Sequence, residues 1–538
     1  MAVSTPAVSV QYAPLWVVRT FFGILLLLGA LLVADYGVSW DEPVDHANGL
    51  VSLRYIADKV APAWSANQAL LQNSPVLEGY VENDHGALFE IPMVLFDVLR
   101  PGTDTRTYHL FRHACIFLTC VGGIWALYRL ALLRLRNGYV ALVAAALFVL
   151  SPRMFAESFY SGKDMVFLAT FTLGMYTLAR LLERPTLRRA LLHGIATGVA
   201  VDIRILGIML VPFTLTLLAL ELWFPTGPSI RRQVATVIGG YLVCAVAAII
   251  VGWPYLWASP FNHFLAAFEN MRRFRWPGFV LYMGRQESAL ALPWHYAPVW
   301  ILITTPVTYS AAAVLGLLGV AMRGIKRPLE LLKTYNGRLD LLFSGWLVLP
   351  VFMVIALDSV IYDGWRHLYF VYPALLLLAV SAGWQLWQRG RTSPRLRPVV
   401  LALGAVVALE AAVTAVRMVL MHPNQQVYFS FLPAEQVEQQ FERDYWGLSY
   451  RQGLEYLIKR HPEGQIFVDP THRAPFENNR EMLAPADQQR LIADPNAPGR
   501  YYITGYRDTP GRVTPEMGQE VYSVKAGGVT ILSVCKRP

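Results

Sequence analysis

The chain alternates long apolar segments with short polar connections. The first segment, 15–33, is almost wholly apolar, and one helical crossing of a bilayer takes about 20 such residues. Ten later segments have the same character: 106–128, 138–151, 164–182, 190–202, 206–224, 234–253, 297–321, 340–357, 367–387 and 398–420. The pattern predicts a polytopic α-helical membrane protein with about eleven transmembrane helices, of which 190–202 is short and could be half-buried.

Two connections are much longer than turns. The first, 36–105, contains an apolar stretch at 87–99 that is too short to cross the bilayer and predicts an amphipathic helix in the interface. The second, 254–296, is rich in arginine. It is interpreted either as a basic helix that rests on anionic lipid or as a segment that binds an anionic headgroup.

The chain beyond the last apolar segment is polar. It contains a helical pattern near 450–459. Strand-like runs lie at 465–468, 501–504 and 529–534, separated by turns rich in Pro and Gly. We therefore predict a transmembrane domain over 1–420 and a small α+β domain over 421–538.

Charge gives the predicted orientation. The chain is 55% hydrophobic and 15% charged, whereas soluble domains carry about 25% charged residues. Its Lys and Arg residues concentrate in alternate connections, which the positive-inside rule assigns to the cytoplasm. The N-terminus is then cytoplasmic, and both long connections and the C-terminal domain lie outside. The formal net charge of +9 is scattered over short connections, so it does not form the basic stripe of a nucleic-acid-binding protein.

Ionisable residues gather at the ends of the apolar segments, on the predicted outer face. Asp41 and Glu42 follow the first segment, and Lys163 and Asp164 open a later one. The other members are Arg204, Arg366, His367 and His85. Each has a structural explanation by itself, such as helix capping for the aspartates or headgroup contact for the arginines. Together they indicate a polar cleft at the membrane surface.

Carboxylates and guanidinium groups in one cleft are suited to group transfer from a phosphate. A carboxylate can take the proton of an attacking hydroxyl, and Arg or Lys can stabilise the charge on a departing phosphate. The main alternative is a multi-span transporter or flippase of an anionic lipid or sugar, which would place ionisable residues near the midplane. Mid-span charges are few here, and Glu410 and Arg417 are the clearest exceptions. A structural assembly partner is a third alternative, but it leaves the acidic residues unexplained.

Several motifs follow one another in a fixed order. They are Trp40-Asp41-Glu42-Pro43, Ser151-Pro152-Arg153 with Lys163-Asp164, Pro293-Trp294-His295-Tyr296, and Arg366-His367-Leu368-Tyr369 with Pro373. In this order the chain resembles the GT-C glycosyltransferases, the broad group that holds the protein O-mannosyltransferases and the lipid A aminoarabinose transferase. Asp84-His85-Gly86 departs from the pattern, because relatives have a Lys or His before two prolines there. His295 also departs from it, because it replaces an aromatic residue.

The resemblance implies a GT-C fold, a polyprenyl-phosphate sugar donor and an inverting direct displacement. It implies a bacterial inner membrane, with the outer connections and the C-terminal domain in the periplasm. Asp41 would be the catalytic base, with Glu42 beside it and Asp164 orienting the acceptor. The donor phosphate would be bound by Arg204, Arg366, Lys163 and His85.

Further candidates for substrate contact are His367, Tyr369, Arg285, His295 and Tyr296. The acceptor would be a lipid, a polysaccharide or a protein. Carboxylates beside a phosphate can also hold Mg²⁺ or Mn²⁺. The surrounding arginines make a metal less necessary, so we predict neither a metal nor another cofactor.

Overall fold

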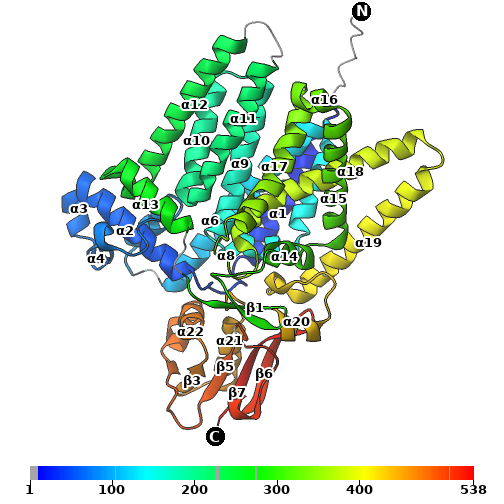
Figure 1. Cartoon of the computed structure of the whole chain (residues 1–538). Helices are drawn as coiled ribbons and strands as arrows, with labels where there is room; N and C mark the ends of the chain where they lie inside the picture. Colours follow the sequence, from blue (N-terminus) through cyan, green and yellow to red (C-terminus); the bar gives the residue numbers. More distant parts are fainter. Residues whose placement is uncertain (1–9, 103, 225–229, 273–275, 508, 538) are drawn as a thin grey trace, which may run out of the picture.

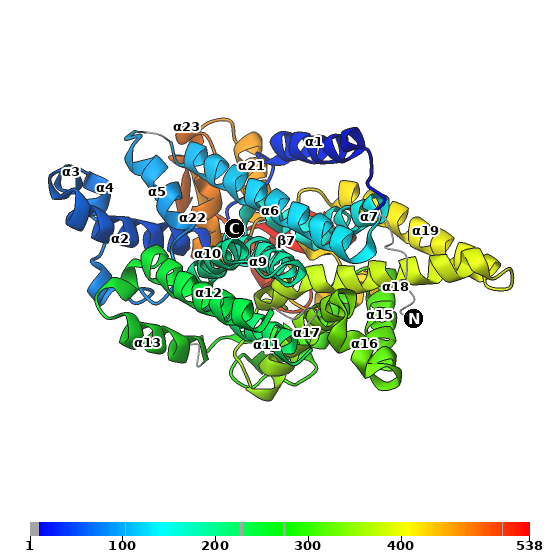
Figure 2. The same cartoon turned by 90° about the horizontal axis from the view of Figure 1, so that it is seen from above.

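Long helices form a bundle with a small sheet at one end (Figure 1). The computed structural model describes residues 10–102, 104–224, 230–272, 276–507 and 509–537. We call the end of the bundle that carries the five-stranded sheet the sheet side. In the view from above, α1 and α19 lie at the periphery, and both helices are largely exposed, whereas most of α9 and α18 is buried (Figure 2).

In the described part of the chain, nine helices are long and apolar enough to cross a membrane. They are α1 (Leu15–Leu32), α6 (Thr105–Leu135), α9 (Asp164–Glu183), η2 with α11 (Ile205–Trp223), α12 (Ile230–Gly252), α15 (Val307–Lys326), α17 (Tyr335–Ala356), η4 with α18 (Arg366–Thr392) and α19 (Arg397–Met421). These nine correspond one to one to predicted apolar segments. The prediction of a multi-span helical membrane protein is confirmed.

The other two predicted segments have different forms. Segment 138–151 becomes α7 (Gly138–Val149), which is followed by α8 (Pro152–Tyr160) after a bend of 71°. The bend occurs at Pro152, whose ring and missing N–H prevent a straight continuation of the preceding helix. Segment 190–202 becomes α10 (Leu187–Ile203), a helix of 17 residues that packs along α12. Within the described residues there are therefore nine helices that are long and apolar enough to cross a membrane, or ten if the bent pair is one span, against the roughly eleven predicted.

The two long connections fold into short elements on the sheet side (Figure 1). The first contains α2 (Glu42–Val60), α3 (Pro62–Ala66), α4 (Ala69–Gln72), η1 (Leu77–Gly79) and α5 (Glu90–Val98). The predicted amphipathic helix at 87–99 corresponds to α5, whose Val94 and Val98 pack on Leu50 and Leu53 of α2. The second contains η3 (Pro254–Trp257), α13 (Pro260–Arg272) and a hairpin of β1 (Phe279–Tyr282) and β2 (Arg285–Ser288), and α14 (Tyr296–Thr304) follows it.

The C-terminal region, residues 421–538, contains a five-stranded sheet, as the predicted α+β class requires. The strand order is β4-β3-β5-β7-β6. Its strands are β3 (Ile466–Pro470), β4 (Leu491–Ala493), β5 (Tyr501–Thr504), β6 (Gln519–Ala526) and β7 (Val529–Lys536). β3 pairs in parallel with β4 and β5, and β7 pairs antiparallel with β5 and β6. The helices of this region are α20 (Ala434–Gln440), α21 (Tyr450–Arg460), α22 (Arg473–Arg480) and α23 (Pro485–Gln488), with η5 (Gln425–Val427) and η6 (Pro515–Met517).

The two mid-span charges of α19 bind backbone groups. The Glu410 carboxylate accepts hydrogen bonds from the backbone N–H of Val307 and Thr308, both at 2.8 Å, at the start of α15. A helix start leaves such N–H groups without intrahelical partners, so Glu410 caps α15 from a neighbouring helix. Arg417 donates to the carbonyl oxygens of Phe429 at 2.7 Å and Ser430 at 3.1 Å. Both charges therefore have a structural use and do not indicate a transport path.

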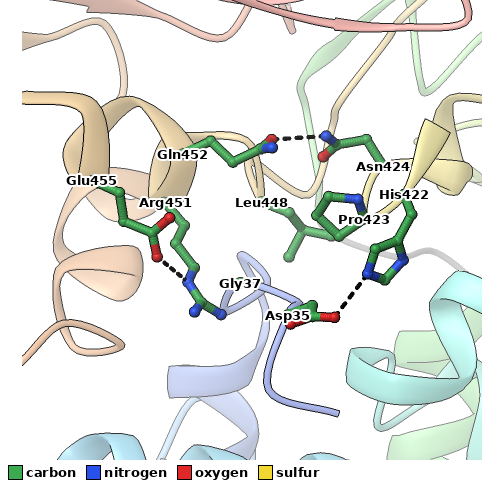
Figure 3. Close-up of a pocket in the computed structure, with 9 residues that line it drawn as sticks. All are labelled: Asp35, Gly37, His422, Pro423, Asn424, Leu448, Arg451, Gln452 and Glu455. Atoms are coloured by element: carbon green, nitrogen blue, oxygen red, sulfur yellow. Dashed lines mark hydrogen bonds and ion pairs between the residues drawn. The ribbon is translucent and has the colours of Figure 1, made fainter. Parts of the chain in front are cut away.

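The C-terminal region meets the bundle beside a pocket of about 370 Å³ (Figure 3). Its lining comes from the chain after α1, the end of α19 and the start of α21. Two ion pairs cross or border the pocket: His422 Nε2 lies 2.9 Å from Asp35 Oδ2, and Arg451 Nε lies 2.8 Å from Glu455 Oε1. The first pair joins the chain after α1 to the chain after α19, and the second lies within α21.

Candidate active site

The Trp-Asp-Glu-Pro motif forms a turn that begins α2. The chain leaves α1 at Leu32 and re-enters a helix at Glu42, with Asp41 at the N-cap position and Pro43 in the first turn. Proline suits the first helical turn because its missing N–H would have no partner there, and acidic residues are favourable at this end of a helix. The backbone N–H of Ser39 donates to Glu42 Oε1 at 2.8 Å and closes the turn. This geometry fixes the position of Asp41.

The structure brings four predicted site residues from four separate segments together. Arg366 Nη1 lies 2.9 Å from Asp41 Oδ2 and 3.2 Å from Asp164 Oδ2. Arg204 Nη2 lies 2.9 Å from Asp164 Oδ1. Because the starts of α2, α9 and η4 and the end of α10 meet on the sheet side, residues at these ends form one row of alternating charge. We call these four residues the Asp41 cluster.

Exposure differs strongly within the Asp41 cluster and decides which groups can meet a ligand. The Asp41 side chain is 32% exposed and that of Arg204 is 16% exposed. Arg366 and Asp164 are buried, with 2% and 0% of their side chains exposed. Nearby Lys163 is 18% exposed and pairs through Nζ with Asp45 Oδ1 at 3.1 Å. A ligand can therefore reach one carboxylate and two cations.

Charge around Asp41 keeps its carboxylate ionised. Burial alone would raise the pKa of Asp41, but the positive charges of Arg366 and Lys163 outweigh burial and hold it below the ordinary value. Burial likewise opposes the charge of Lys163, while Asp45 and Asp41 together raise its pKa. The pair therefore offers an ionised base and a charged amine side by side at neutral pH.

Arg366 also connects the Asp41 cluster to the C-terminal region. Its Nη2 lies 3.3 Å from Asp363 Oδ2, and Asp363 Oδ1 lies 2.7 Å from Nη2 of Arg507. Burial raises the pKa of Asp363, although Arg507 and Arg366 oppose this effect. Arg366 thus binds three carboxylates and is almost fully buried. Its contact with a donor phosphate stays a prediction, and in the structure its guanidinium organises these three carboxylates.

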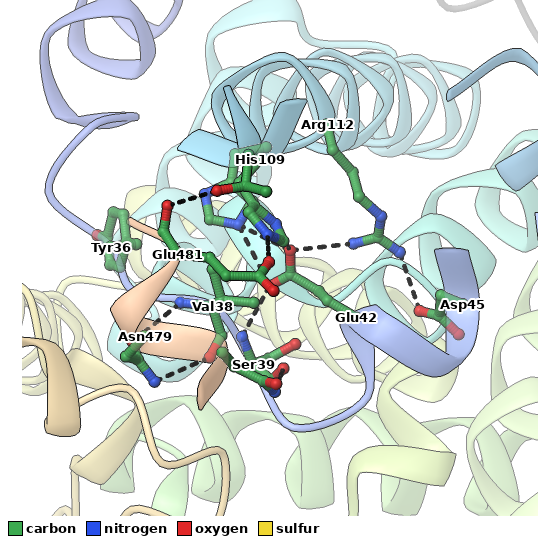
Figure 4. Close-up of polar contacts among 12 residues, drawn as sticks. Tyr36, Val38, Ser39, Glu42, Asp45, His109, Arg112, Asn479 and Glu481 are labelled. Carbon is green, nitrogen blue, oxygen red and sulfur yellow. Dashed lines mark hydrogen bonds and ion pairs between the residues drawn. The ribbon is translucent and has the colours of Figure 1, made fainter. Parts of the chain in front are cut away.

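Glu42 points into a buried cage instead of the Asp41 cluster (Figure 4). Its carboxylate is 1% exposed and lies 3.2 Å from His109 Nδ1, 3.2 Å from His113 Nε2 and 3.6 Å from Arg112 Nη1. Burial would raise the pKa of Glu42, but His113, His109 and Arg112 hold it well below the ordinary value. We predicted Glu42 as a catalytic neighbour of Asp41, and the structure places it as an anchor of the turn.

Glu42→Gln is expected to lower stability more than it slows the chemical step. Removing one partner of a buried charge network costs about 3–5 kcal/mol, because the remaining charges stay buried without compensation. Thermal unfolding of the purified variant, compared with the exposed-site control Glu78→Gln, measures this loss. If Glu42→Gln kept its unfolding temperature and lost activity, Glu42 would act in catalysis after all.

The cage contains residues that the sequence interpretation missed. Arg112 Nη2 lies 2.9 Å from Asp45 Oδ2 and 2.8 Å from Glu90 Oε1. His109 Nε2 lies 2.9 Å from Glu481 Oε2 in the C-terminal region. A signal was present, since His109, Arg112 and His113 share one face at the start of an apolar segment, where ionisable groups are costly.

His85 lies in a separate acidic group. Its Nδ1 is 3.1 Å from Asp84 Oδ1 and 3.2 Å from Glu82 Oε2. Asp84 also accepts a hydrogen bond from Asn270 Nδ2 of α13 at 2.6 Å. Glu82, Asp84 and His85 are the only His, Cys, Asp or Glu residues of the described chain whose ligand atoms cluster at metal-binding spacing, within 4.8 Å of one another. His85 contacts two carboxylates in the structure, and its contact with a donor phosphate stays a prediction.

His367 and Tyr369 follow Arg366 in η4 and have different partners. The His367 ring packs edge-on against Tyr362 at 4.8 Å, and the same Tyr362 ring lies 4.7 Å from the Arg366 guanidinium. The Tyr369 hydroxyl is buried and donates to Glu157 Oε1 at 2.7 Å. His367 is therefore adjacent to the Asp41 cluster, whereas Tyr369 belongs to a buried network behind it.

Arg285, His295 and Tyr296 belong to the second long connection. Arg285 is exposed on β2, and the Tyr282 hydroxyl of β1 lies 2.6 Å from His295 Nδ1. The Tyr296 hydroxyl accepts a hydrogen bond from the Gly364 backbone N–H at 3.1 Å, next to Asp363. Tyr296 thus supports the loop that carries Arg366. The described contacts do not join Arg285 or His295 to the Asp41 cluster.

Comparisons with known proteins agree with the predicted resemblance. Residues 57–269 match the family model of dolichyl-phosphate-mannose-protein mannosyltransferases. The matched stretch contains Lys163, Asp164 and Arg204 and begins after Asp41. A comparison with curated proteins finds no match.

Two solved structures are similar to this chain. One is the oligosaccharyltransferase of Archaeoglobus fulgidus, in a crystal structure with Zn and sulfate, at 11% identity and a TM-score of 0.44 over 90% of this chain and 68% of that chain. The other is ArnT of Cupriavidus metallidurans in the apo state, at 14% identity and a TM-score of 0.48 over 96% of this chain and 97% of that chain. The family match over 57–269 confirms the predicted resemblance to the GT-C glycosyltransferases, in a chain that has the helices of a multi-span membrane protein.

Proposed function

We propose that the chain transfers a sugar from a polyprenyl-phosphate donor to an acceptor at the sheet side, by inverting direct displacement. The observation that carries this proposal is the exposed edge of the Asp41 cluster. There an ionised carboxylate, Asp41, lies beside two partly exposed cations, Arg204 and Lys163. This is the pairing of base and phosphate ligands that such a transfer needs.

In the proposed reaction, an acceptor hydroxyl or amine lies against Asp41 and attacks the anomeric carbon of the donor sugar. As the new bond forms, Asp41 takes the acceptor proton and the bond between sugar and phosphate breaks on the opposite face. The leaving polyprenyl phosphate carries the displaced electron pair. Arg204 and Lys163 stabilise that negative charge, and Asp164 holds Arg204 in place at 2.9 Å. Because two cations serve the phosphate, we propose a reaction without a divalent metal.

We further propose that the sheet side faces the periplasm of a bacterial inner membrane. Segments rich in Arg and Lys connect the spans at the other end of the bundle, where the positive-inside rule expects the cytoplasm. The ion pairs of Arg134 and Arg323 with Asp340, at 2.6 and 2.7 Å, lie near the ends of α6, α15 and α17, next to those segments. Acceptors would then be lipids, polysaccharides or proteins of the cell envelope.

Mass spectrometry of the cell envelope tests the function. Envelopes from cells with and without the gene are expected to differ by one sugar mass on one component, and the wild-type gene should restore it. If the protein were a flippase, cells without the gene would instead transport less of its substrate. Sugars that are attached on the cytoplasmic side would remain. Finding no lost sugar mass would contradict the transferase proposal.

Arg204→Ala is expected to weaken donor binding, with a smaller effect on the rate at saturating donor. Arg204 provides one of the two exposed cations, and charge-assisted contacts to phosphate contribute about 1.5–3 kcal/mol, or roughly 10- to 150-fold in affinity. Binding of a synthetic polyprenyl phosphate to the purified protein measures this effect. Arg204→Lys should bind more tightly than Arg204→Ala. Arg188→Ala serves as the control, because Arg188 is exposed at the start of α10, whereas Arg204 follows the end of that helix. Unchanged affinity in Arg204→Ala would remove Arg204 from the phosphate site.

A further inference from the structure

The segment from Ala34 to Trp40, which leads directly to Asp41, is held by side chains of the C-terminal region. Arg451 Nη1 donates to the carbonyl oxygens of Ala34 at 2.6 Å and Tyr36 at 2.8 Å. Arg451 lies at the start of α21, beside the pocket of Figure 3. The segment itself has no regular secondary structure, so its conformation depends on partners elsewhere in the chain.

Asn479 of α22 makes the most specific of these contacts (Figure 4). Its Oδ1 accepts a hydrogen bond from the Val38 backbone N–H at 3.1 Å, and its Nδ2 lies 3.2 Å from the Val38 carbonyl oxygen. One side-chain amide therefore pairs with both polar groups of one residue, as a neighbouring β-strand would. Nδ2 also lies 2.9 Å from the carbonyl oxygen of Pro475 and 3.0 Å from that of Gly447, which fixes the amide within its own region. The Asn479 side chain is fully buried.

Two neighbouring contacts also bind this segment to the C-terminal region. Asn478 Nδ2 donates to the Ser39 carbonyl oxygen at 3.1 Å. The Arg507 guanidinium lies over the Trp40 ring at 4.8 Å, and Arg507 is the partner of Asp363, which binds Arg366. The C-terminal region thus reaches both sides of Asp41, through the backbone before it and through the arginine beside it.

Gly37 shows how closely the two parts approach. A Cβ atom at this position would lie 2.2 Å from Asn479 Oδ1 and 2.9 Å from the Leu448 carbonyl oxygen. Both distances are too short for a real side chain, and Leu448 contributes backbone that cannot rotate away. Glycine is therefore needed here for a close backbone approach, and the amide of Asn479 occupies the space.

We propose that Asn479 is a positioning residue for Asp41, acting through Val38 and Ser39, and that docking of the C-terminal region sets the geometry of the base. The proposal rests on the proposed function, since it takes Asp41 as the base. It assigns the C-terminal region a role in turnover that is separate from donor binding. Arg204 and Lys163, which serve the donor, make none of the described contacts with this region.

Asn479→Ala in the full-length purified protein tests the proposal by two measurements. Hydrogen exchange at the backbone amides of residues 36–40 is expected to become faster by about tenfold or more, while exchange in α6 and α9 stays unchanged. The rate of transfer at saturating donor is expected to fall by about 100-fold, the effect of a misplacement near 1 Å. The KM for donor should stay within about twofold. A general loss of folding would instead change exchange and unfolding temperature throughout.

Asn424→Ala is the matched control, because Asn424 is also a buried asparagine at the junction but donates to Gln452 at 2.7 Å and not to the segment. Asn478→Ala removes one backbone contact. Its hydrogen exchange at residues 36–40 and its transfer rate should lie between those of the control and those of Asn479→Ala. In addition, the effects of Gly37→Ala and Asn479→Ala on the transfer rate should be non-additive in the double variant, since both changes act on one contact.

The outcomes separate this inference from the proposed function. Unchanged exchange at residues 36–40 in Asn479→Ala, with transfer abolished by Asp41→Asn, would overturn the positioning role and leave the transferase proposal intact. Faster exchange with an unchanged transfer rate would show that the contact is structural only. This result would also overturn the positioning role. If the wild type transfers no sugar, the proposed function fails, and the role assigned to Asn479 in turnover fails with it.

Discussion

Sugar transfer is expected to fall by about 100- to 10,000-fold when Asp41 is replaced by Asn, the range that a general base contributes. The amide keeps the shape of the side chain but cannot take a proton from the acceptor. Its oxygen can still accept a hydrogen bond from Arg366, so the fold and the binding of donor should persist. Transfer rate, thermal unfolding and polyprenyl phosphate binding of the purified variant check these three expectations. Normal turnover by Asp41→Asn would remove Asp41 as the base.

Asp35→Asn is the matched control for this experiment. Asp35 lies six residues earlier in the sequence, has a side chain that is 46% exposed, and pairs with His422 rather than with the Asp41 cluster. Its loss should leave the transfer rate within about twofold, because surface pairs contribute at most about 1 kcal/mol. A large loss in Asp35→Asn would indicate that negative charge in general, and not the base at residue 41, supports transfer.

The pH dependence of transfer follows from the charge around Asp41. Because Arg366 and Lys163 hold the pKa of Asp41 below its ordinary value of 3.8, the carboxylate remains ionised at all pH values above that value. The rate should therefore be flat as pH falls from about 7 to about 5, and should decline only as pH falls through the lowered pKa. Rates measured over this range at saturating donor would show the plateau. A decline centred near neutral pH would point to a different base.

The sequence was informative about the Asp41 cluster because of where its members lie. Asp41, Asp164, Arg204 and Arg366 each lie at the end of an apolar segment, and alternate ends of spanning helices must meet on one face. The distribution of Lys and Arg over the connections then predicts that these four residues lie on the same side of the membrane, without any knowledge of packing. Their burial is not predictable in this way, because it depends on which helix ends are neighbours. For this reason Arg366 was expected at a phosphate and is found among three carboxylates.

The cage around Glu42 and the contacts of Asn479 depend on long-range packing. Glu42 is adjacent to Asp41 in sequence, but the helical start at residue 42 turns its side chain toward α6. Asn479 is 441 residues away from Val38, and no local pattern distinguishes it from a surface asparagine. The predicted strand-like runs correspond to β3, β5 and β7, whereas β4 and β6 were not predicted. β4 has only three residues, and β6 is an edge strand whose residues are mostly exposed or half-buried. Neither strand has the apolar pattern of a central strand.

Arg366→Gln is expected to have the second large effect, on stability and on the pH profile together. Arg366 binds Asp41 at 2.9 Å, Asp164 at 3.2 Å and Asp363 at 3.3 Å, and its own side chain is buried. Removing the shared cation leaves three nearby carboxylates, of which Asp164 keeps Arg204 and Asp363 keeps Arg507. Breaking such a buried network costs about 3–5 kcal/mol. Thermal unfolding of the purified variant should show this loss.

The sign of the pH effect distinguishes an organiser from a phosphate ligand. Without Arg366, burial raises the pKa of Asp41 with less opposition, so the carboxylate protonates at higher pH and the acid decline of the transfer rate moves upward. Arg366→Lys keeps one charge but cannot reach three carboxylates with a planar fork, so its stability and its pH profile should be intermediate. If Arg366→Gln instead kept the wild-type stability and pH profile and only required more donor, Arg366 would contact the donor phosphate, as the sequence first suggested. The two roles predict opposite patterns, because an organiser acts on the base before substrate arrives, whereas a phosphate ligand acts only when donor is bound.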